Sequence, residues 1–211
     1  MSLHRYKIAR GLTLIELIIA LAITAVTAGI LAVLINATAV GTNASQDGRR
    51  GLVRTQAIKA QVGDALVNAR AILAVGSNAI VYWTGDVAGA PTPAEGAVNL
   101  SELRLLEVDG SGNLNLYACQ WPAGFSNTSI IAADQIYAPN TDWLAAAQTA
   151  KGSGYFPATL LASSVTGMTA CLDASTPTAA RMVQLTITIN DGVSARAVLI
   201  GAALQTPQAP Q

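Results

Sequence analysis

An uncharged run near the amino terminus constrains this chain more than any other feature of its sequence. Residues 17–46 contain no Asp, Glu, Lys or Arg, and most of them are apolar. About 18 consecutive apolar residues are enough to indicate a helix that spans a bilayer. We therefore expect residues 12–40 to form a transmembrane helix. The 211 residues leave room for one further domain of ordinary size.

A single carboxylate, Glu16, stands at the head of the apolar run. It lies five residues after Gly11, and the residues before that glycine include Arg5, Lys7 and Arg10. A charge inside a membrane helix costs about 3 kcal/mol on insertion scales, so it is normally kept only with a partner or a function. The natural partner for Glu16 would be a nearby cation.

Residues 11–17, Gly-Leu-Thr-Leu-Ile-Glu-Leu, resemble the processing and methylation motif of type IV prepilins and of the pseudopilins of type II secretion systems. The resemblance implies that a prepilin peptidase cuts between Gly11 and Leu12, that the new amino terminus of Leu12 is methylated, and that Glu16 is needed for assembly. It also implies the partners: other pilin or pseudopilin subunits, the peptidase, an inner-membrane assembly platform and membrane lipid. Leu12 stands where phenylalanine is usual.

The motif has a physical mechanism that does not depend on the family name. After cleavage, the α-amino group of Leu12 would be a cation one helical turn from the Glu16 carboxylate. A lone buried charge is expensive and a paired one is tolerable, so pairing between neighbouring subunits would set the axial register of one apolar helix against the next. The apolar surface supplies attraction, and the carboxylate supplies register.

The basic residues before the apolar run predict its orientation. Lys and Arg stay on the cytoplasmic side, so the chain after Val40 is expected outside the cytoplasm. The resemblance then implies a single-pass protein of the inner membrane that later joins a filament at the cell surface or in the periplasm. The apolar run also lacks the proline found in many major pilins, which favours a minor pilin or minor pseudopilin.

Two other interpretations of the amino terminus stay open. It could be a secretory signal peptide cut after Ala37-Thr38-Ala39, although the apolar run is longer than the 7 to 15 residues usual for such peptides. It could also be a plain anchor carrying an extracytoplasmic adhesin or ligand-binding module. The mature amino terminus separates the three: Leu12 for a prepilin, Val40 for a secreted protein, and the initiator region for an anchor.

The helical pattern extends beyond the apolar run. No proline precedes Pro91, so one helix could run from about residue 13 to residue 75, with bends or fraying expected at Gly41, Gly48 and Gly51. Its second part carries a narrow apolar stripe at three- and four-residue spacing, formed by Ile58, Val62, Ala65, Leu66, Ala69, Ile72 and Leu73. The expected divisions are a leader (1–11), a transmembrane or filament-core helix (12–40), its amphipathic continuation (41–76), a β-rich exported head (77–204) and a disordered tail (205–211).

The head shows strand patterns. Residues 80–83 form a short β-like run, residues 103–108 and 114–117 flank the turn 109–113, and residues 182–189 and 195–200 flank a turn at 190–192. These four or more strands predict an α+β fold in which the amphipathic helix packs on an antiparallel sheet. A calcium loop at 109–113 is disfavoured, because Asp109 is its only carboxylate and no glutamate follows at the required distance.

Residues 120–158 are less regular, with many aromatic residues and a possible short helix at 141–150. The stretch could complete the core or present a surface to a partner. The two cysteines, Cys119 and Cys171, both fall in the exported part, where a pair most simply forms a disulfide. Such a bond would contribute roughly 4 kcal/mol, and pilin domains often contain one, but two buried free thiols are the alternative.

Several chemistries are disfavoured. The only histidine, His4, lies in the leader, so the mature chain could build no histidine-dependent nucleophile pair or zinc site. We expect neither an enzyme nor a cofactor or metal. Removing the leader takes three basic residues from twelve and leaves nine against twelve acidic ones, which argues against general nucleic-acid binding.

Overall fold

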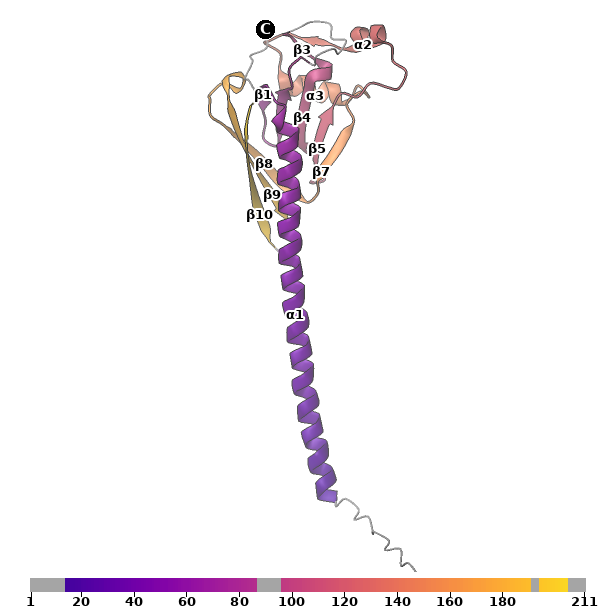
Figure 1. The fold of residues 1–211 in the computed structure, drawn as a ribbon, viewed down its shortest axis with the longest axis vertical. Helices are drawn as coiled ribbons and strands as arrows, with labels where there is room; N and C mark the ends of the chain where they lie inside the picture. Colours follow the sequence, from indigo (N-terminus) through magenta and orange to yellow (C-terminus); the bar gives the residue numbers. More distant parts are fainter. Residues whose placement is uncertain (1–13, 87–95, 191–193, 205–211) are drawn as a thin grey trace, which may run out of the picture. The chain divides into compact units, whose positions relative to one another are not determined.

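The structure, a computed structural model, describes residues 14–86, 96–190 and 194–204, with the side chains of residues 40–48 and 50 left out. The chain divides into two compact units, Met1–Leu52 and Val53–Gln211, and each is considered by itself. The first unit contributes helix only. All described strands belong to the second unit, called the head below (Figure 1).

Helix α1 spans Leu14–Val67 and continues through Gly41, Gly48 and Gly51. It ends before the predicted limit at residue 76, because Ala71–Val75 form strand β1. This stretch had fitted the apolar stripe of a helix. In the head, however, Ile72 packs in one hydrophobic core and Leu73 in another. Neighbouring residues point to opposite sides in a strand, so only a strand satisfies both cores.

In the described part of the chain, ten strands form three antiparallel sheets. The largest has the order β1-β2-β4-β5-β7, with β2 at Ala79–Trp83, β4 at Leu103–Val108, β5 at Leu114–Ala118 and β7 at Ala158–Ala162. A second has the order β10-β9-β8, with β8 at Val165–Leu172, β9 at Met182–Asn190 and β10 at Ala195–Ala203. The third pairs β3, Val98–Asn99, with β6, Ile136–Tyr137.

Short helices complete the head. Helix α2 spans Asn127–Ala133, and α3 spans Trp143–Lys151, close to the helix predicted at 141–150. The Asp142 side chain accepts a hydrogen bond from the N–H of Ala145 and caps α3. The 3-10 turns η1, Leu100–Glu102, and η2, Pro177–Ala179, precede β4 and β9.

The head contains two hydrophobic cores. The first lies where the end of α1 packs against the larger sheet and the β8–β9–β10 sheet (Figure 1), and it includes Ile58, Val62 and Leu66 of the predicted stripe. The second lies on the other face of the larger sheet, under α3, and includes Trp83, Leu105 and Trp143. The predicted α+β class is confirmed, as are the hairpins β4–β5 and β9–β10.

Candidate functional site

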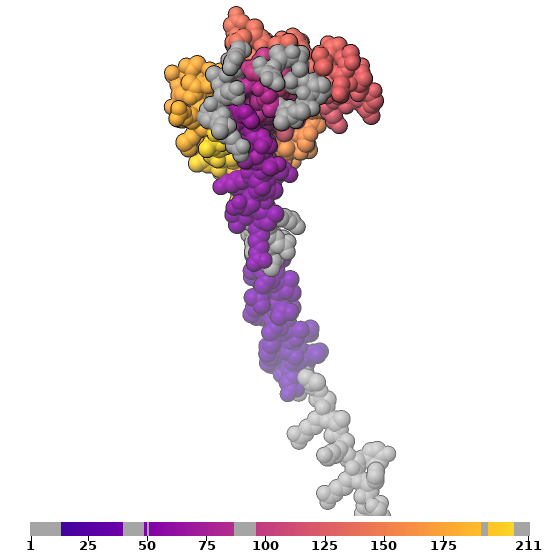
Figure 2. Space-filling model, turned by 45° about the horizontal axis from the view of Figure 1, so that its top comes forward, coloured from indigo at the N-terminus to yellow at the C-terminus, as the bar shows by residue number. Residues whose placement is uncertain are grey.

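The apolar part of α1, residues 14–39, has no core of its own. Every described residue in it is exposed, and the side chains form an uncovered apolar surface (Figure 2). By length and composition this stretch can cross a membrane, and it is the single such helix among the described residues. At 1.5 Å per residue its 26 residues measure about 39 Å, more than the roughly 30 Å hydrocarbon thickness of a bilayer.

The hydroxyl groups in this stretch are satisfied inside the helix. The side chains of Thr24, Thr27 and Thr38 donate to the backbone carbonyls four residues earlier, over 2.7, 2.9 and 3.0 Å. Hydrogen-bonding groups without partners cost several kcal/mol in hydrocarbon, so this arrangement suits lipid or a bundle of similar helices. The three threonine hydroxyl groups therefore need no hydrogen-bond partner outside the helix.

Glu16 lies in the first turn of α1, at the start of the apolar surface, and its residue is exposed. Acidic side chains are favoured near a helix amino terminus, where the backbone N–H groups carry partial positive charge. The predicted processing residues, Gly11 and Leu12, lie outside the described residues. Their geometry relative to Glu16 therefore stays a prediction.

A second polar group lies buried in the head. Glu102 is fully buried, and its Oε2 accepts hydrogen bonds from Trp83 Nε1 at 2.9 Å and from the backbone and side-chain nitrogens of Asn99, each at 3.3 Å. Its Oε1 has no hydrogen-bond partner. Burial raises the pKa of Glu102, and these hydrogen bonds oppose the rise. Sequence reasoning missed this cluster, although Asn-x-x-Glu is the spacing of a helix-capping box.

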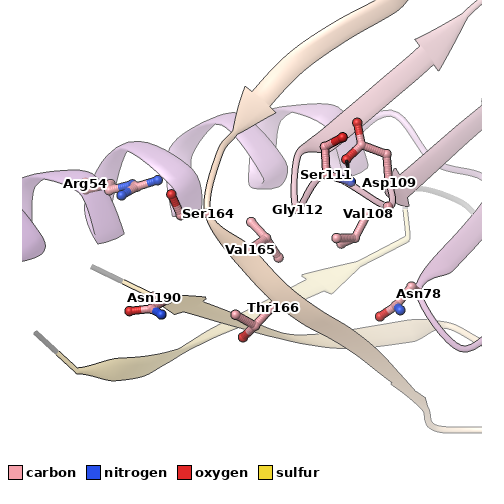
Figure 3. Close-up of a pocket in the computed structure, with 11 residues that line it drawn as sticks. Arg54, Asn78, Val108, Asp109, Ser111, Gly112, Ser164, Val165, Thr166 and Asn190 are labelled. Atoms are coloured by element: carbon pink, nitrogen blue, oxygen red, sulfur yellow. Dashed lines mark hydrogen bonds between the residues drawn. The ribbon is translucent and has the colours of Figure 1, made fainter. Parts of the chain in front are cut away.

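A hollow of about 740 Å³ in the head lies between α1, the β4–β5 turn and β8 (Figure 3). Its polar groups are already engaged. Arg54 donates to the backbone carbonyl and hydroxyl of Ser163, and the Asn78 side chain accepts from the N–H of Met168 at 3.0 Å. We therefore interpret this hollow as a gap between packed elements of the fold.

Asp109, at the edge of the same hollow, closes the β4–β5 turn. Its Oδ1 accepts from the backbone N–H groups of Ser111 and Asn113 at 2.9 and 2.8 Å, and its Oδ2 accepts from the side chains of Asn113 and Asn115. The backbone hydrogen bond from Asn113 is the main reason that the pKa of Asp109 is lowered. Asp109 thus stabilises the β4–β5 turn.

Three partly buried aromatic residues form what we call the ring cluster: Trp121, which also packs against the second core, Phe125 and Tyr155. The centroid distances are 5.3 Å between Trp121 and Tyr155, 5.9 Å between Phe125 and Tyr155, and 6.3 Å between Trp121 and Phe125. A backbone hydrogen bond from Gln120 to Tyr155 joins the two segments. The sequence had pointed to this aromatic stretch without predicting which rings meet.

The predicted disulfide is not present. Cys119 and Cys171 are both free thiols. Cys119 follows β5 and packs against the second core, whereas Cys171 lies in β8 of the other sheet and is exposed. From the sequence, both cysteines were expected in the exported part. The sequence does not reveal that the strands form separate sheets, and the two cysteines lie apart because one follows a strand of the larger sheet and the other lies in the β8–β9–β10 sheet.

Among the described residues, no three His, Cys, Asp or Glu side chains are grouped so that they could hold a metal ion. The described part of the chain thus offers an uncovered apolar helix headed by one carboxylate, and a head whose polar clusters serve its own packing.

Comparison with known proteins gave one finding. The family model described as "Prokaryotic N-terminal methylation motif" matches residues 6–32, which include Gly11, Leu12, Glu16 and the apolar surface as far as residue 32. No curated protein and no solved structure matches the chain.

Proposed function

Because the chain is a type IV pilin-like protein, we propose that it is a structural subunit of a type IV pilus or a pseudopilus. The observation that supports this most is the conjunction of the methylation motif with an uncovered apolar helix that begins at Leu14. In this proposal, prepilin peptidase cuts between Gly11 and Leu12, and Leu12 becomes the methylated amino terminus.

The apolar surface of α1 serves two environments in turn. Lipid surrounds it while the subunit waits in the inner membrane, with the head outside the cytoplasm. Filament growth then extracts the helix, because neighbouring helices replace lipid as equally apolar surroundings. The internally bonded threonines favour both states, since no hydroxyl needs water in either.

Glu16 selects the register between helices. Apolar surfaces attract without direction, so they do not fix how far one helix slides along another. The Glu16 carboxylate of one subunit pairs with the α-ammonium group of Leu12 on its neighbour, and a shift that separates the two leaves buried charges unpaired. In this proposal the other subunits are partners through this pairing, and the inner-membrane assembly platform is the partner during filament growth.

Within this class, we propose a minor subunit with a structural, non-enzymatic role. Two features support it: the apolar helix contains no proline, and the head carries additional elements between β5 and β8, namely α2, β6, α3 and β7. A tightly repeating major subunit would gain little from such additions. Abundance in sheared filaments tests the assignment, since a minor subunit is present in traces.

Mass spectrometry of the mature amino terminus tests the proposed function. In cells with working pilus machinery we expect a chain that begins at Leu12 and carries one additional methyl group. Gly11→Val should keep its leader, whereas the matched change Gly29→Val, in the same apolar segment, should still be cut. Neighbouring atoms do not crowd Gly29, so a side chain fits there.

Retention of the leader in the wild-type chain would contradict the proposal. A protein that keeps its leader and functions without any prepilin peptidase would instead be an anchored extracytoplasmic module, such as an adhesin.

A further inference from the structure

One polar side chain in the apolar part of α1 differs from the others. The hydroxyl groups in residues 14–39 donate to carbonyls of their own helix, as given above for Thr24, Thr27 and Thr38. The side-chain amide of Asn36 forms no hydrogen bond with any described residue, and the residue is exposed. An amide that both donates and accepts is therefore left unsatisfied on an apolar surface.

The chain around Asn36 does not supply a partner for this amide. On a helix, the neighbours of a side chain lie three and four residues away. Those positions hold Ala32, Val33, Ala39 and Val40, none of which has a polar side chain. The amide is not bonded to a carbonyl of the preceding turn either, in contrast to the threonines. A partner for Asn36 must therefore come from its surroundings.

A bilayer can satisfy the amide at its boundary. Asn36 lies twenty residues after Glu16, so the two side chains are about 30 Å apart along the helix, which is roughly the hydrocarbon thickness of a bilayer. A spanning helix with Glu16 at one boundary has Asn36 at the other, where water and lipid headgroups form hydrogen bonds. The subunit can thus wait in the membrane without a buried, unpaired amide.

Filament assembly removes that boundary. When neighbouring helices replace lipid around α1, apolar side chains surround the Asn36 amide on every side. A buried amide without a hydrogen bond is destabilising, so the favoured packing is one in which the neighbouring helix supplies the partner. Polar side chains such as Asn, Ser and Thr hydrogen-bond between helices in this way in membrane proteins.

The surface beside Asn36 lets a second helix come close. Gly29 and Ala32 precede Asn36 by seven and four residues, so all three lie on one face of α1. Small residues allow two helix backbones to approach closely. A backbone carbonyl has two lone pairs, and one remains available after the bond within its own helix. The carbonyls of a close neighbour are therefore suitable acceptors for the Asn36 amide.

We propose that the Asn36 side chain donates a hydrogen bond to a backbone carbonyl on the apolar helix of a neighbouring pilin-like subunit. The inference rests on the proposed function and adds a second register contact, about 30 Å along the helix from Glu16. Apolar attraction does not select an axial position, whereas one amide with one acceptor does. A single buried Asn fixes the register of coiled coils for the same reason.

Filament incorporation of variants tests the proposal. In cells with working pilus machinery, mass spectrometry measures each variant in sheared filaments relative to its amount in the inner membrane. Asn36→Leu, which removes the amide at similar size, should be cut at Leu12 and inserted normally but fall about three- to tenfold in the filaments. Asn36→Gln, which keeps an amide, should lie between Asn36→Leu and the wild type. Thr27→Val, which removes a hydroxyl bonded to the carbonyls of Ile23 and Thr24, is the matched control and should be unchanged.

A photoreactive side chain at position 36 identifies the partner directly. Irradiated filaments should contain an adduct that joins position 36 to the amino-terminal apolar helix of a pilin-like subunit. Adducts with lipid alone, or with a head, would overturn the proposal. Wild-type incorporation of Asn36→Leu, or an equal loss in Thr27→Val, would also overturn it.

The role of Asn36 and the proposed function fail in different ways. A wild-type chain that keeps its leader contradicts the proposed function, and the role of Asn36 with it. A wild-type chain that is cut at Leu12 and enters filaments, together with an Asn36→Leu chain that enters equally well, contradicts the role of Asn36 alone.

Discussion

The carboxyl group of Glu102 shows how burial and hydrogen bonding have opposite effects on the pKa of a single residue. Burial raises its pKa, and the hydrogen bonds from Trp83 and Asn99 limit the rise. The protonated form therefore stabilises the fold. That contribution is fully present below the unfolded pKa of about 4.3 and is lost as the pH rises through the higher folded value.

Glu102→Gln should reveal this dependence. Gln keeps an oxygen that can accept from Trp83 but cannot ionise, so the free energy of unfolding of the variant should rise relative to the wild type as the pH increases above about 4.3. Glu102→Ala should be destabilised by about 1–3 kcal/mol, because it leaves buried donors without an acceptor. Urea unfolding of the solubilised chain at several pH values measures both. If the difference in the free energy of unfolding between the wild type and Glu102→Gln does not change with pH, the account is contradicted.

The two thiols should react at different rates. Burial raises the pKa of Cys119 to about 12, which keeps its reactive thiolate scarce, whereas Cys171 is exposed. Labelling of the native chain with a maleimide should therefore modify Cys171 first and Cys119 only after unfolding. Cys119→Ser and Cys171→Ser assign the two phases. A chain that takes up label only after reduction would show that the thiols are linked after all.

At the scale of elements, the β4–β5 turn depends on a glycine. Gly112 has a φ of +75°, and a Cβ there would lie 2.9 Å from the carbonyl oxygen of Val165. Gly112→Ala should destabilise the head by about 1–3 kcal/mol. Gly110→Ala, in the same turn but with open space around it, should change stability by less than about 1 kcal/mol. Thermal or urea unfolding compares them, and equal effects would remove the steric argument.

Helix α1 should show a sharp contrast between neighbouring residues in the head. Leu66 is fully buried in the first core, while Val67 is 42% exposed. Leu66→Ala should cost about 2–5 kcal/mol, since it removes buried surface and leaves a cavity. Val67→Ala should fall near 0.5 kcal/mol or less. If both changes have the same effect on the unfolding midpoint, the helix does not pack through the predicted stripe.

At the scale of the whole molecule, the sequence predicted those parts in which one local pattern decides the structure. The uncharged run, the stripe through Ile58 and Val62, and the two hairpins each have a clear period or turn. Their structures follow from local geometry and from the need to bury or expose one face.

The remainder depends on contacts between distant segments. Strand β8 has the sequence Val-Thr-Gly-Met-Thr-Ala-Cys-Leu, with a register shift after Val165, so its alternation is weak. Strand β1 had a helical pattern, and only the presence of two cores makes it a strand. The missing disulfide has the same origin, because the sequence does not reveal which sheet each cysteine joins.

An acid at the entrance of the apolar helix is proposed to fix how subunits align, and filament incorporation of Glu16→Ala measures this most directly. The variant should be cut at Leu12 and reach the membrane. Its amount in sheared filaments should fall at least about tenfold, because the neighbour's ammonium group loses its partner at a cost of about 3–5 kcal/mol. Thr24→Val, which alters a hydroxyl bonded only within the helix, is the matched control. Wild-type levels of Glu16→Ala in the filament fraction would contradict the account.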